Sequence, residues 1–237
     1  MKTLLILGSK PHPKLPPPST YQEVACSNAS GYSAKIYHLP RPIFTVMTPI
    51  IGCEIESGEQ SLKAISGLST DTVYMLRRRY AGWNSIASLS HFLKTFKKKP
   101  IHRMQPFYLQ RKLKSVCYKY NNFVALHSHE YDTLVERLCD NDRKVCSQLQ
   151  RKRPSTGVIS LALAIDQQLY NRYILCGFNF ELTHSYGVNP VIMVRGTSVS
   201  SHAKTDAMVF GYLAKKLANI FTTEKAVHNC AGVPLLF

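Results

Sequence analysis

The sequence lacks the short motifs that identify several classes of enzyme. It contains neither a G-x-x-x-x-G-K-[ST] loop nor a G-x-G-x-x-G fingerprint, which argues against a P-loop or dinucleotide-binding enzyme. A G-x-S-x-G nucleophile elbow is also absent. Asp140 and Asp142 have the spacing of a metal-binding carboxylate pair, but they stand in a polar helical region. We expect these two side chains to be solvated and the site to hold no metal.

Paired cysteines and long apolar runs are missing too. The seven cysteines form no C-x-x-C pair, and most of them, such as Cys26, Cys117 and Cys176, are expected to be reduced, buried thiols of a cytosolic protein. No apolar run is long enough to cross a membrane. The run that follows Met1 is too short for a secretory signal. We therefore expect a cytoplasmic protein that is either soluble or peripheral to a membrane.

Acidic residues are scarce. The chain has 14 Asp and Glu against 30 Lys and Arg, so its formal net charge is +16. This balance favours anionic partners, which include nucleic acid, phosphorylated small molecules and an anionic membrane face. With 237 residues, of which 45% are hydrophobic, the chain can bury the core of one large α/β domain.

Short apolar runs near the start predict parallel strands whose carboxyl ends carry small polar residues. The runs and these residues are 3–8 with Gly8 and Ser9, 23–26 with Asn28, and 43–47 with Thr48. A helix at 54–64 and a fourth strand at 72–76 follow. In a doubly wound sheet such strand ends line a polar crevice where ligands bind.

The middle of the chain, 77–153, is basic. Its charged clusters lie at 77–79, 97–99, 111–114 and 151–153. Apolar residues at helical spacing predict a basic amphipathic helix at 84–98, whose apolar face packs on the core or, alternatively, lies on anionic lipid. A second helix is expected at 131–150. His127 and His129 could share one face of a strand, but no further ligand has suitable spacing for zinc.

The most informative stretch is 153–206. Hydroxyl residues and a glycine at 155–157 precede an apolar run at 158–169, which predicts a buried helix, and a buried strand is expected at 173–177. Hydroxyls in that place usually cap the helix, although they can also cradle a phosphate or carboxylate. His202 precedes a helix expected at 206–217. Taken alone, it is more often a surface or capping residue than a catalytic base.

Taken together, these residues resemble the bacterial lipooligosaccharide sialyltransferases of glycosyltransferase family forty-two. The matching motifs are Arg-Pro-Ser-Thr-Gly at 153–157, Gly-Phe-Asn-Phe at 177–180, Tyr186, and His-Ala-Lys-Thr-Asp at 202–206. The resemblance implies one domain over 1–237, of the α/β class. It would contain a single Rossmann-like, mostly parallel, GT-A-like sheet flanked by helices, with a small helical lid within 178–201.

The resemblance also implies an activity. It is the inverting, metal-independent transfer of sialic acid from CMP-sialic acid to a hydroxyl of a glycan or glycolipid acceptor, without a cofactor. His202 would be the general base, Tyr186 would bind the departing phosphate, and Arg153 would hold a carboxylate or phosphate. The implied substrate-binding residues are Gly8, Ser9, Asn28, Thr48, Ser155, Thr156, Gly157, Gly177, Asn179 and Glu181.

Three positions depart from the family pattern. Glu181 replaces a second tyrosine, and Ser9 and Thr48 replace longer amide side chains. The basic surface suits an acceptor anchored in the inner face of a membrane, and a homo-oligomer is left open.

A competing interpretation is a basic binding module without catalysis, acting on nucleic acid or a membrane surface. Aromatic residues interleave with the basic clusters, as in surfaces that bind single strands; they are Tyr74, Tyr80, Trp83, Phe107, Tyr108, Tyr118 and Tyr120. No RNA-binding signature supports nucleic acid as a partner. A transferase should gather positive charge around the strand ends, whereas a nucleic-acid binder should carry it along an outer groove.

Overall fold

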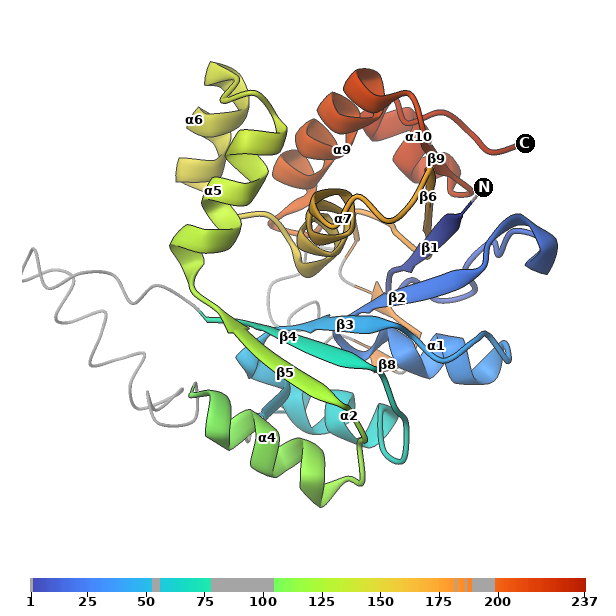
Figure 1. Ribbon diagram of the computed structural model, residues 1–237, viewed down its shortest axis with the longest axis vertical. Coiled ribbons are helices and arrows are strands. Elements are labelled where there is room, and N and C mark those ends of the chain that lie inside the picture. Colours follow the sequence, from blue (N-terminus) through green and yellow to red (C-terminus); the bar gives the residue numbers. More distant parts are fainter. Residues whose placement is uncertain (1, 53–55, 78–104, 182, 186, 189–198) are drawn as a thin grey trace, which may run out of the picture.

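A seven-stranded parallel sheet forms the centre of the protein (Figure 1). The computed structural model describes residues 2–52, 56–77, 105–181, 183–185, 187–188 and 199–237. The strands are β1 (Thr3–Leu7), β2 (Glu23–Ser27), β3 (Phe44–Met47), β4 (Thr72–Leu76), β5 (Asn122–Leu126), β6 (Arg172–Cys176) and β9 (Ile220–Thr222), arranged in the order β5-β4-β3-β2-β1-β6-β9. A short antiparallel ribbon of β7 (Thr183–His184) and β8 (Gly187–Val188) stands apart from the sheet.

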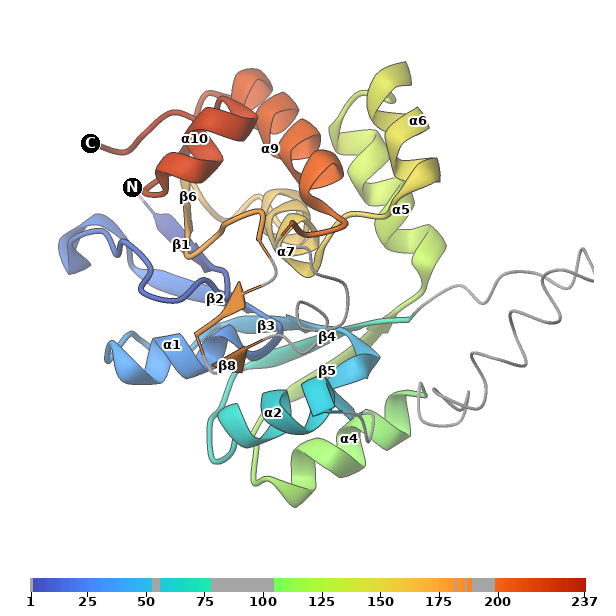
Figure 2. The same ribbon diagram turned by 180° about the vertical axis from the view of Figure 1, so that it is seen from behind.

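Helices cover both faces of the sheet (Figures 1 and 2). One face carries α1 (Gly31–Ile36), α2 (Glu56–Ala64) and α4 (Pro106–Ser115); the other carries α5 (Ser128–Leu138), α6 (Arg143–Arg151), α7 (Thr156–Asp166), α9 (Ala203–Leu217) and α10 (Lys225–Ala231). Single 3-10 turns at Pro18–Thr20, Asn28–Ser30 and Pro49–Gly52 complete the described elements. The Rossmann-like architecture expected from the sequence is therefore confirmed.

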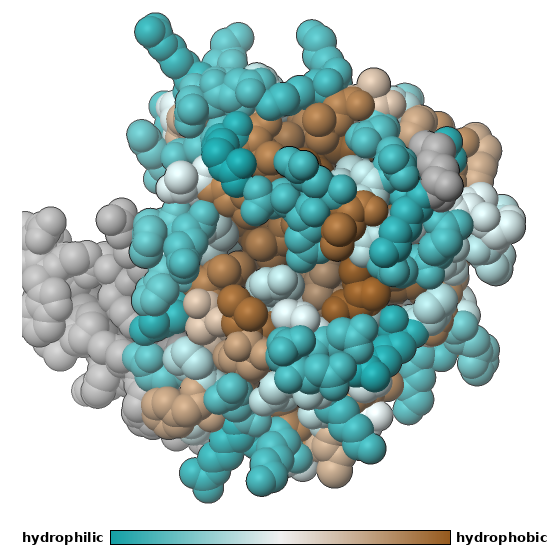
Figure 3. Space-filling view, viewed as in Figure 1, coloured by the Kyte–Doolittle hydropathy of each residue, from teal (hydrophilic) through white to brown (hydrophobic). Residues whose placement is uncertain are grey.

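Hydrophobic cores lie on both faces of the sheet, because an inner strand, β1, is apolar on both of its sides. In β1, Leu4 and Ile6 join the core under α7, while Leu5 and Leu7 join a second cluster on the α1 side. All four side chains are fully buried, as expected of a parallel strand covered on both faces. At the surface in Figure 3, apolar residues show between the elements and hydrophilic residues surround them.

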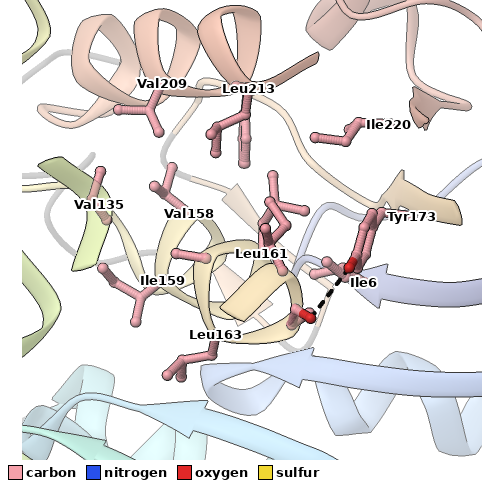
Figure 4. Close-up of a cluster of buried hydrophobic side chains, with 14 of the residues drawn as sticks. Ile6, Val135, Val158, Ile159, Leu161, Leu163, Tyr173, Val209, Leu213 and Ile220 are labelled. Carbon is pink, nitrogen blue, oxygen red and sulfur yellow. Dashed lines mark hydrogen bonds between the residues drawn. The ribbon is translucent and has the colours of Figure 1, made fainter. Parts of the chain in front are cut away.

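Helix α7 is buried from Thr156 to Ile165. It lies between the sheet and two other helices, so apolar side chains reach it from every side (Figure 4). Figure 4 labels contributors from the neighbouring elements: Ile6, Val135, Tyr173, Val209, Leu213 and Ile220. The Tyr173 hydroxyl donates to the carbonyl of Ala164 at 3.3 Å. This packing fixes where the amino end of α7 points.

Some expectations about the chain are wrong. The helix expected at 131–150 is two helices, because Asp140 and Asn141 adopt positive φ and Asp142 caps α6 through the amides of Lys144 and Val145. His127 caps α5 rather than lying on a strand. Cys117 is exposed, whereas Cys26 and Cys176 are buried as expected, and burial raises the pKa of both buried thiols to about 12.

Other expectations fall outside the described residues. These are the helix at 84–98 and, from the aromatic and basic surface of the middle segment, Tyr80, Trp83 and the charged residues at 78–79 and 97–99. Within the lid expected at 178–201, the described residues include the β7–β8 ribbon, and the helical part stays a prediction because 189–198 are not described. In the part of the chain that is described, no helix has the length and apolarity needed to span a bilayer.

Candidate active site at the carboxyl ends of the strands

The strand order reverses between β1 and β6, and two glycines meet there. The chain runs outward from β1 to β5 and returns to β6 on the other side of β1, which is where ligands bind in open α/β sheets. A Cβ on Gly8 would lie 2.4 Å from the carbonyl oxygen of Gly177, and one on Gly177 would lie 2.8 Å from that of Gly8. Gly177 also has a φ of +69°. Both predicted site glycines are therefore required by close backbone approach.

A buried carboxylate that the sequence analysis missed supports this junction. Glu224, which follows β9, is 2% exposed. Its carboxylate accepts from the amides of Gly177 and Lys14, each at 3.0 Å, and pairs with the ammonium of Lys10. It therefore joins the loop after β1 to the loop after β6. Glu224 could not be predicted as a site residue from the sequence, because the strand before it has only three residues.

Asn28 connects two other predicted site residues, Thr156 and Thr48. Its side-chain amide donates to the Thr156 hydroxyl at 2.8 Å, and its carbonyl oxygen accepts from the Thr48 amide at 3.1 Å. The residue has a φ of +52°, a conformation that asparagine tolerates better than most residues. The ends of β2 and β3 and the start of α7 are thus held together at one point.

The start of α7 is capped and closely packed. The Ser155 hydroxyl accepts from the Gly157 amide at 3.2 Å, which confirms the capping interpretation of this serine. A Cβ on Gly157 would lie 2.2 Å from the ring of Phe178, and that ring packs edge-on against Phe210 of α9 at 5.5 Å. Glycine at 157 therefore lets the segment after β6 lie directly against α7.

The first turn of α9 holds the loop that leads into α7. The Thr205 hydroxyl donates to the carbonyl of Lys152 at 3.1 Å, and the Asp206 carboxylate accepts from the Ser155 amide at 2.9 Å. His202 contacts the carbonyl of Arg153 at 2.7 Å through Nδ1. The motifs at 153–157 and 202–206 are therefore one structural unit, although about fifty residues separate them.

The contact of His202 determines which ring nitrogen can act as a base. A backbone carbonyl can only accept, so Nδ1 carries the hydrogen and donates it. In the neutral imidazole the lone pair then resides on Nε2. The residue is partly exposed. A tautomer fixed by a hydrogen bond from Nδ1 to an oxygen atom also occurs in catalytic histidines.

Asp206 is a second titratable group in this unit. It lies in the first turn of α9 and is almost completely buried. Burial raises its pKa to about 7, against the lowering effect of the hydrogen bonds from Ser155. Asp206 belongs to the motif at 202–206, but the sequence alone indicates no role for it.

The Arg153 side chain lies against α5. Its guanidinium contacts the Asp132 carboxylate at 3.5 Å and donates to the Tyr131 hydroxyl at 3.4 Å. The side chain remains about one-third exposed. Its predicted role in binding a carboxylate or phosphate stays a prediction, while its main-chain carbonyl orients His202.

The segment after β6 passes over the strand ends. The Ser185 amide donates to the carbonyl of Ser9 at 2.9 Å, and the Ser185 hydroxyl lies 2.8 Å from that of Ser33 in α1. Asn179 donates to the Thr183 hydroxyl at 2.9 Å. The backbone of Glu181 pairs with that of Val199, and its side chain is exposed.

The structure thus brings most of the predicted site residues to one edge of the sheet. Asn179 and Glu181 lie to the side of it, toward α9, and Tyr186 lies outside the described residues. Among the described residues, no group of three or more His, Cys, Asp and Glu side chains gathers as a metal site would. The polar groups at this edge are backbone amides, hydroxyls, one histidine, cationic side chains and the buried carboxylates of Asp206 and Glu224.

Comparison with known proteins identifies the fold. No family model and no curated protein matches the sequence. The sialyltransferase CstII from Campylobacter jejuni in complex with the substrate analogue CMP-3FNeuAc superposes with a TM-score of 0.51 at 16% identity, over 99% of this chain and 85% of that one. A variant of CST-II with CMP gives 0.54 at 16% identity, over 99% and 86%. CST-II with a trisaccharide acceptor and CMP gives 0.50 at 14%, over 99% and 86%. The protein therefore has the fold of these sialyltransferases.

Proposed function

We propose that this protein transfers sialic acid from CMP-sialic acid to a hydroxyl of a glycan acceptor. The observation that carries the proposal is the hydrogen bond from His202 Nδ1 to the carbonyl of Arg153, because in this tautomer Nε2 is the basic nitrogen of the neutral ring. The fold supports it, because the neighbours with this fold are sialyltransferases bound to CMP or to a CMP analogue. The acceptor we propose is a lipooligosaccharide-type glycan, modified by a cytoplasmic enzyme that sits peripherally on a membrane.

The reaction is a single displacement. The acceptor hydroxyl attacks the anomeric carbon from the face opposite the phosphate, and its proton passes to His202 Nε2. The bond between the anomeric carbon and the phosphate oxygen breaks, and its electron pair leaves with CMP. Attack from the opposite face inverts the anomeric configuration.

Groups at the strand ends are suited to the donor. The amino end of α7 offers a partial positive charge for the phosphate or the sugar carboxylate, and we propose that Arg153, two residues before the Ser155 cap of this helix, adds a cation. Asn28 fixes Thr156 and Thr48 at the crevice wall. We propose that Tyr186 binds the departing phosphate and that these fixed dipoles replace a divalent metal.

The test is CMP release from CMP-sialic acid by the purified protein, with and without glycan acceptors, in the presence of a chelator. We expect release that continues in chelator and falls about 10²- to 10⁴-fold in His202→Ala. Loss of one hydrogen bond should lower the free energy of unfolding by only about 1 kcal/mol.

His228 provides a matched control. Its Nδ1 also bonds a backbone carbonyl, that of Val233, at 2.9 Å, but it lies in α10 away from the strand ends. His228→Ala should cost similar stability and leave CMP release unchanged. An equal loss of activity in both variants would show that His202 acts only through stability. No release at all from the folded protein would overturn the proposed reaction.

A further inference from the structure

Glu224 stands at the carboxyl ends of three neighbouring strands, β1, β6 and β9 (Figure 1). Its backbone amide donates to the Thr222 hydroxyl at 3.0 Å, and this hydroxyl donates to the carbonyl of Leu175 in β6 at 2.9 Å. Thr222 and Glu224 are both buried. The backbone that carries the Glu224 side chain is therefore anchored to the strand beside it.

The two carboxylate oxygens of Glu224 have different partners. Oε1 accepts from the amides of Gly177 and Lys14, each at 3.0 Å, whereas Oε2 pairs with the ammonium of Lys10. The Lys10 amide in turn donates to the carbonyl of Gly177 at 2.8 Å. One oxygen thus holds the backbone of two loops together, and the other has its charge balanced by a lysine.

These two loops contain predicted donor-binding residues. Gly8 and Ser9 belong to the loop after β1, and Gly177 begins the loop after β6. The apparent affinity for a ligand falls with the fraction of protein whose site is in the binding-competent arrangement. A contact that holds both loops in place therefore strengthens donor binding without touching the donor, because less ordering is needed when the donor binds.

We propose that Glu224 is a positioning residue for the nucleotide donor, and that its Oε1 holds Gly177 and the loop after β1 in the arrangement that binds CMP. The inference rests on the proposed function. A negative charge at this place does not itself attract a donor whose phosphate and carboxylate are anions, and Lys10 balances it. The useful property of Glu224 is the reach of its side chain.

Two substitutions separate reach from charge. Glu224→Asp keeps the charge but shortens the side chain by about 1.5 Å, which takes the carboxylate beyond hydrogen-bond distance of the two amides. Glu224→Gln keeps the length and an oxygen for both amides, and removes the charge. We expect Kd for CMP, measured by isothermal titration calorimetry, to rise about tenfold in Glu224→Asp and less than about threefold in Glu224→Gln.

Glu23 provides a matched control at the opposite edge of the sheet. It begins β2, pairs with Lys2 at 2.9 Å and accepts from the Tyr170 hydroxyl. Glu23→Asp should therefore leave Kd for CMP unchanged. The stoichiometry of each titration reports the folded fraction, so a loss of stability alone does not alter the Kd that is measured.

Steady-state kinetics give a second measurement. Because Glu224 contacts the two loops and not the reacting atoms, it should contribute equally to binding of the donor and of the transition state. In Glu224→Asp we therefore expect KM for CMP-sialic acid to rise about tenfold while kcat changes by less than about twofold.

An equal Kd for CMP in the wild type and Glu224→Asp would overturn the inference. A larger loss of affinity in Glu224→Gln than in Glu224→Asp would also overturn it, because the charge would then be the important property. A wild type that binds CMP but releases none from CMP-sialic acid would contradict the proposed reaction alone. A folded wild type that binds no CMP would overturn both.

Discussion

At the β1–β6 junction, glycines without side chains allow two backbone segments to come close together. At the α7–α9 junction, polar side chains hold two segments together by hydrogen bonds to the backbone. Gly8 and Gly177 allow two strand ends to touch. Thr205 and His202 bond main-chain carbonyls, and Asp206 accepts from a main-chain amide. The first junction should therefore fail when atoms are added, and the second when polar atoms are removed or change charge.

The largest effect is expected at the glycine junction. Gly177→Ala should lower the free energy of unfolding by about 2–5 kcal/mol, because positive φ costs a non-glycine residue about 1–2 kcal/mol and overpacking costs about 1–3 kcal/mol. Gly67 is the matched control, since its φ is +72° and nothing lies within 4 Å of a Cβ built there. Gly67→Ala should show only the φ cost. The free energy of unfolding is measured by urea denaturation. If it falls equally in Gly177→Ala and Gly67→Ala, the close contact at Gly177 is relieved without an energetic cost.

A smaller effect is expected where side-chain atoms are removed beside the start of α7. Asn28→Gly keeps the positive φ accessible but deletes both amide hydrogen bonds, so the free energy of unfolding should fall by about 2 kcal/mol. His38 has the same φ of +52° and is exposed. His38→Gly should therefore change stability by less than about 1 kcal/mol. CMP should also stabilise Asn28→Gly less than the wild type in a thermal shift measurement, and an undiminished shift would remove Asn28 from the donor site.

The last effect is a change in pH dependence, rather than in stability at one pH, and it is expected at the α7–α9 junction. The pKa of Asp206 is raised to about 7 in the folded protein, above its unfolded value of about 3.9. The folded state therefore holds a proton that the unfolded state has lost, and the contribution of Asp206 to stability falls as pH rises from about 4 to about 7. Asp206→Asn should lack this decline.

The measurement is the difference in melting temperature between wild type and Asp206→Asn, followed from about pH 5 to about pH 8. Asp166→Asn is the control for losing one negative charge from a basic protein, because Asp166 is partly exposed in an ion pair with Arg137. A difference that does not grow with pH would show that Asp206 keeps an ordinary pKa.

Strands that are apolar and buried along most of their length can be predicted from the sequence. Two strands without such a pattern, β5 and β9, were not predicted. The first strand and β6 are buried throughout or nearly so, so their composition is sufficient evidence. Every residue of the edge strand β5 is at least partly exposed, and β9 has only three residues. Neither carries a local signal strong enough to separate it from a loop.

The candidate site divides in the same way. The motifs around Ser155 and His202 could be recognised in the sequence, and so could Asn28 after its strand. Their mutual contacts could not, because a hydrogen bond such as that between His202 and the carbonyl of Arg153 depends on how α9 packs against α7. The break at Asp140 and Asn141 did leave a local signal, since both residue types favour turns.

The ion pair and amide contacts of Glu224 have a consequence for the order of folding. This side chain meets Lys10 and Lys14 across separations of 214 and 210 residues. Contacts of such range form late because the cost of closing the intervening chain must be met first. The contacts of Glu224 with the loop after β1 can therefore form only once the chain beyond β9 is in place. A nascent chain that has not yet reached Glu224 can assemble most of the sheet while this part of the candidate site is still incomplete.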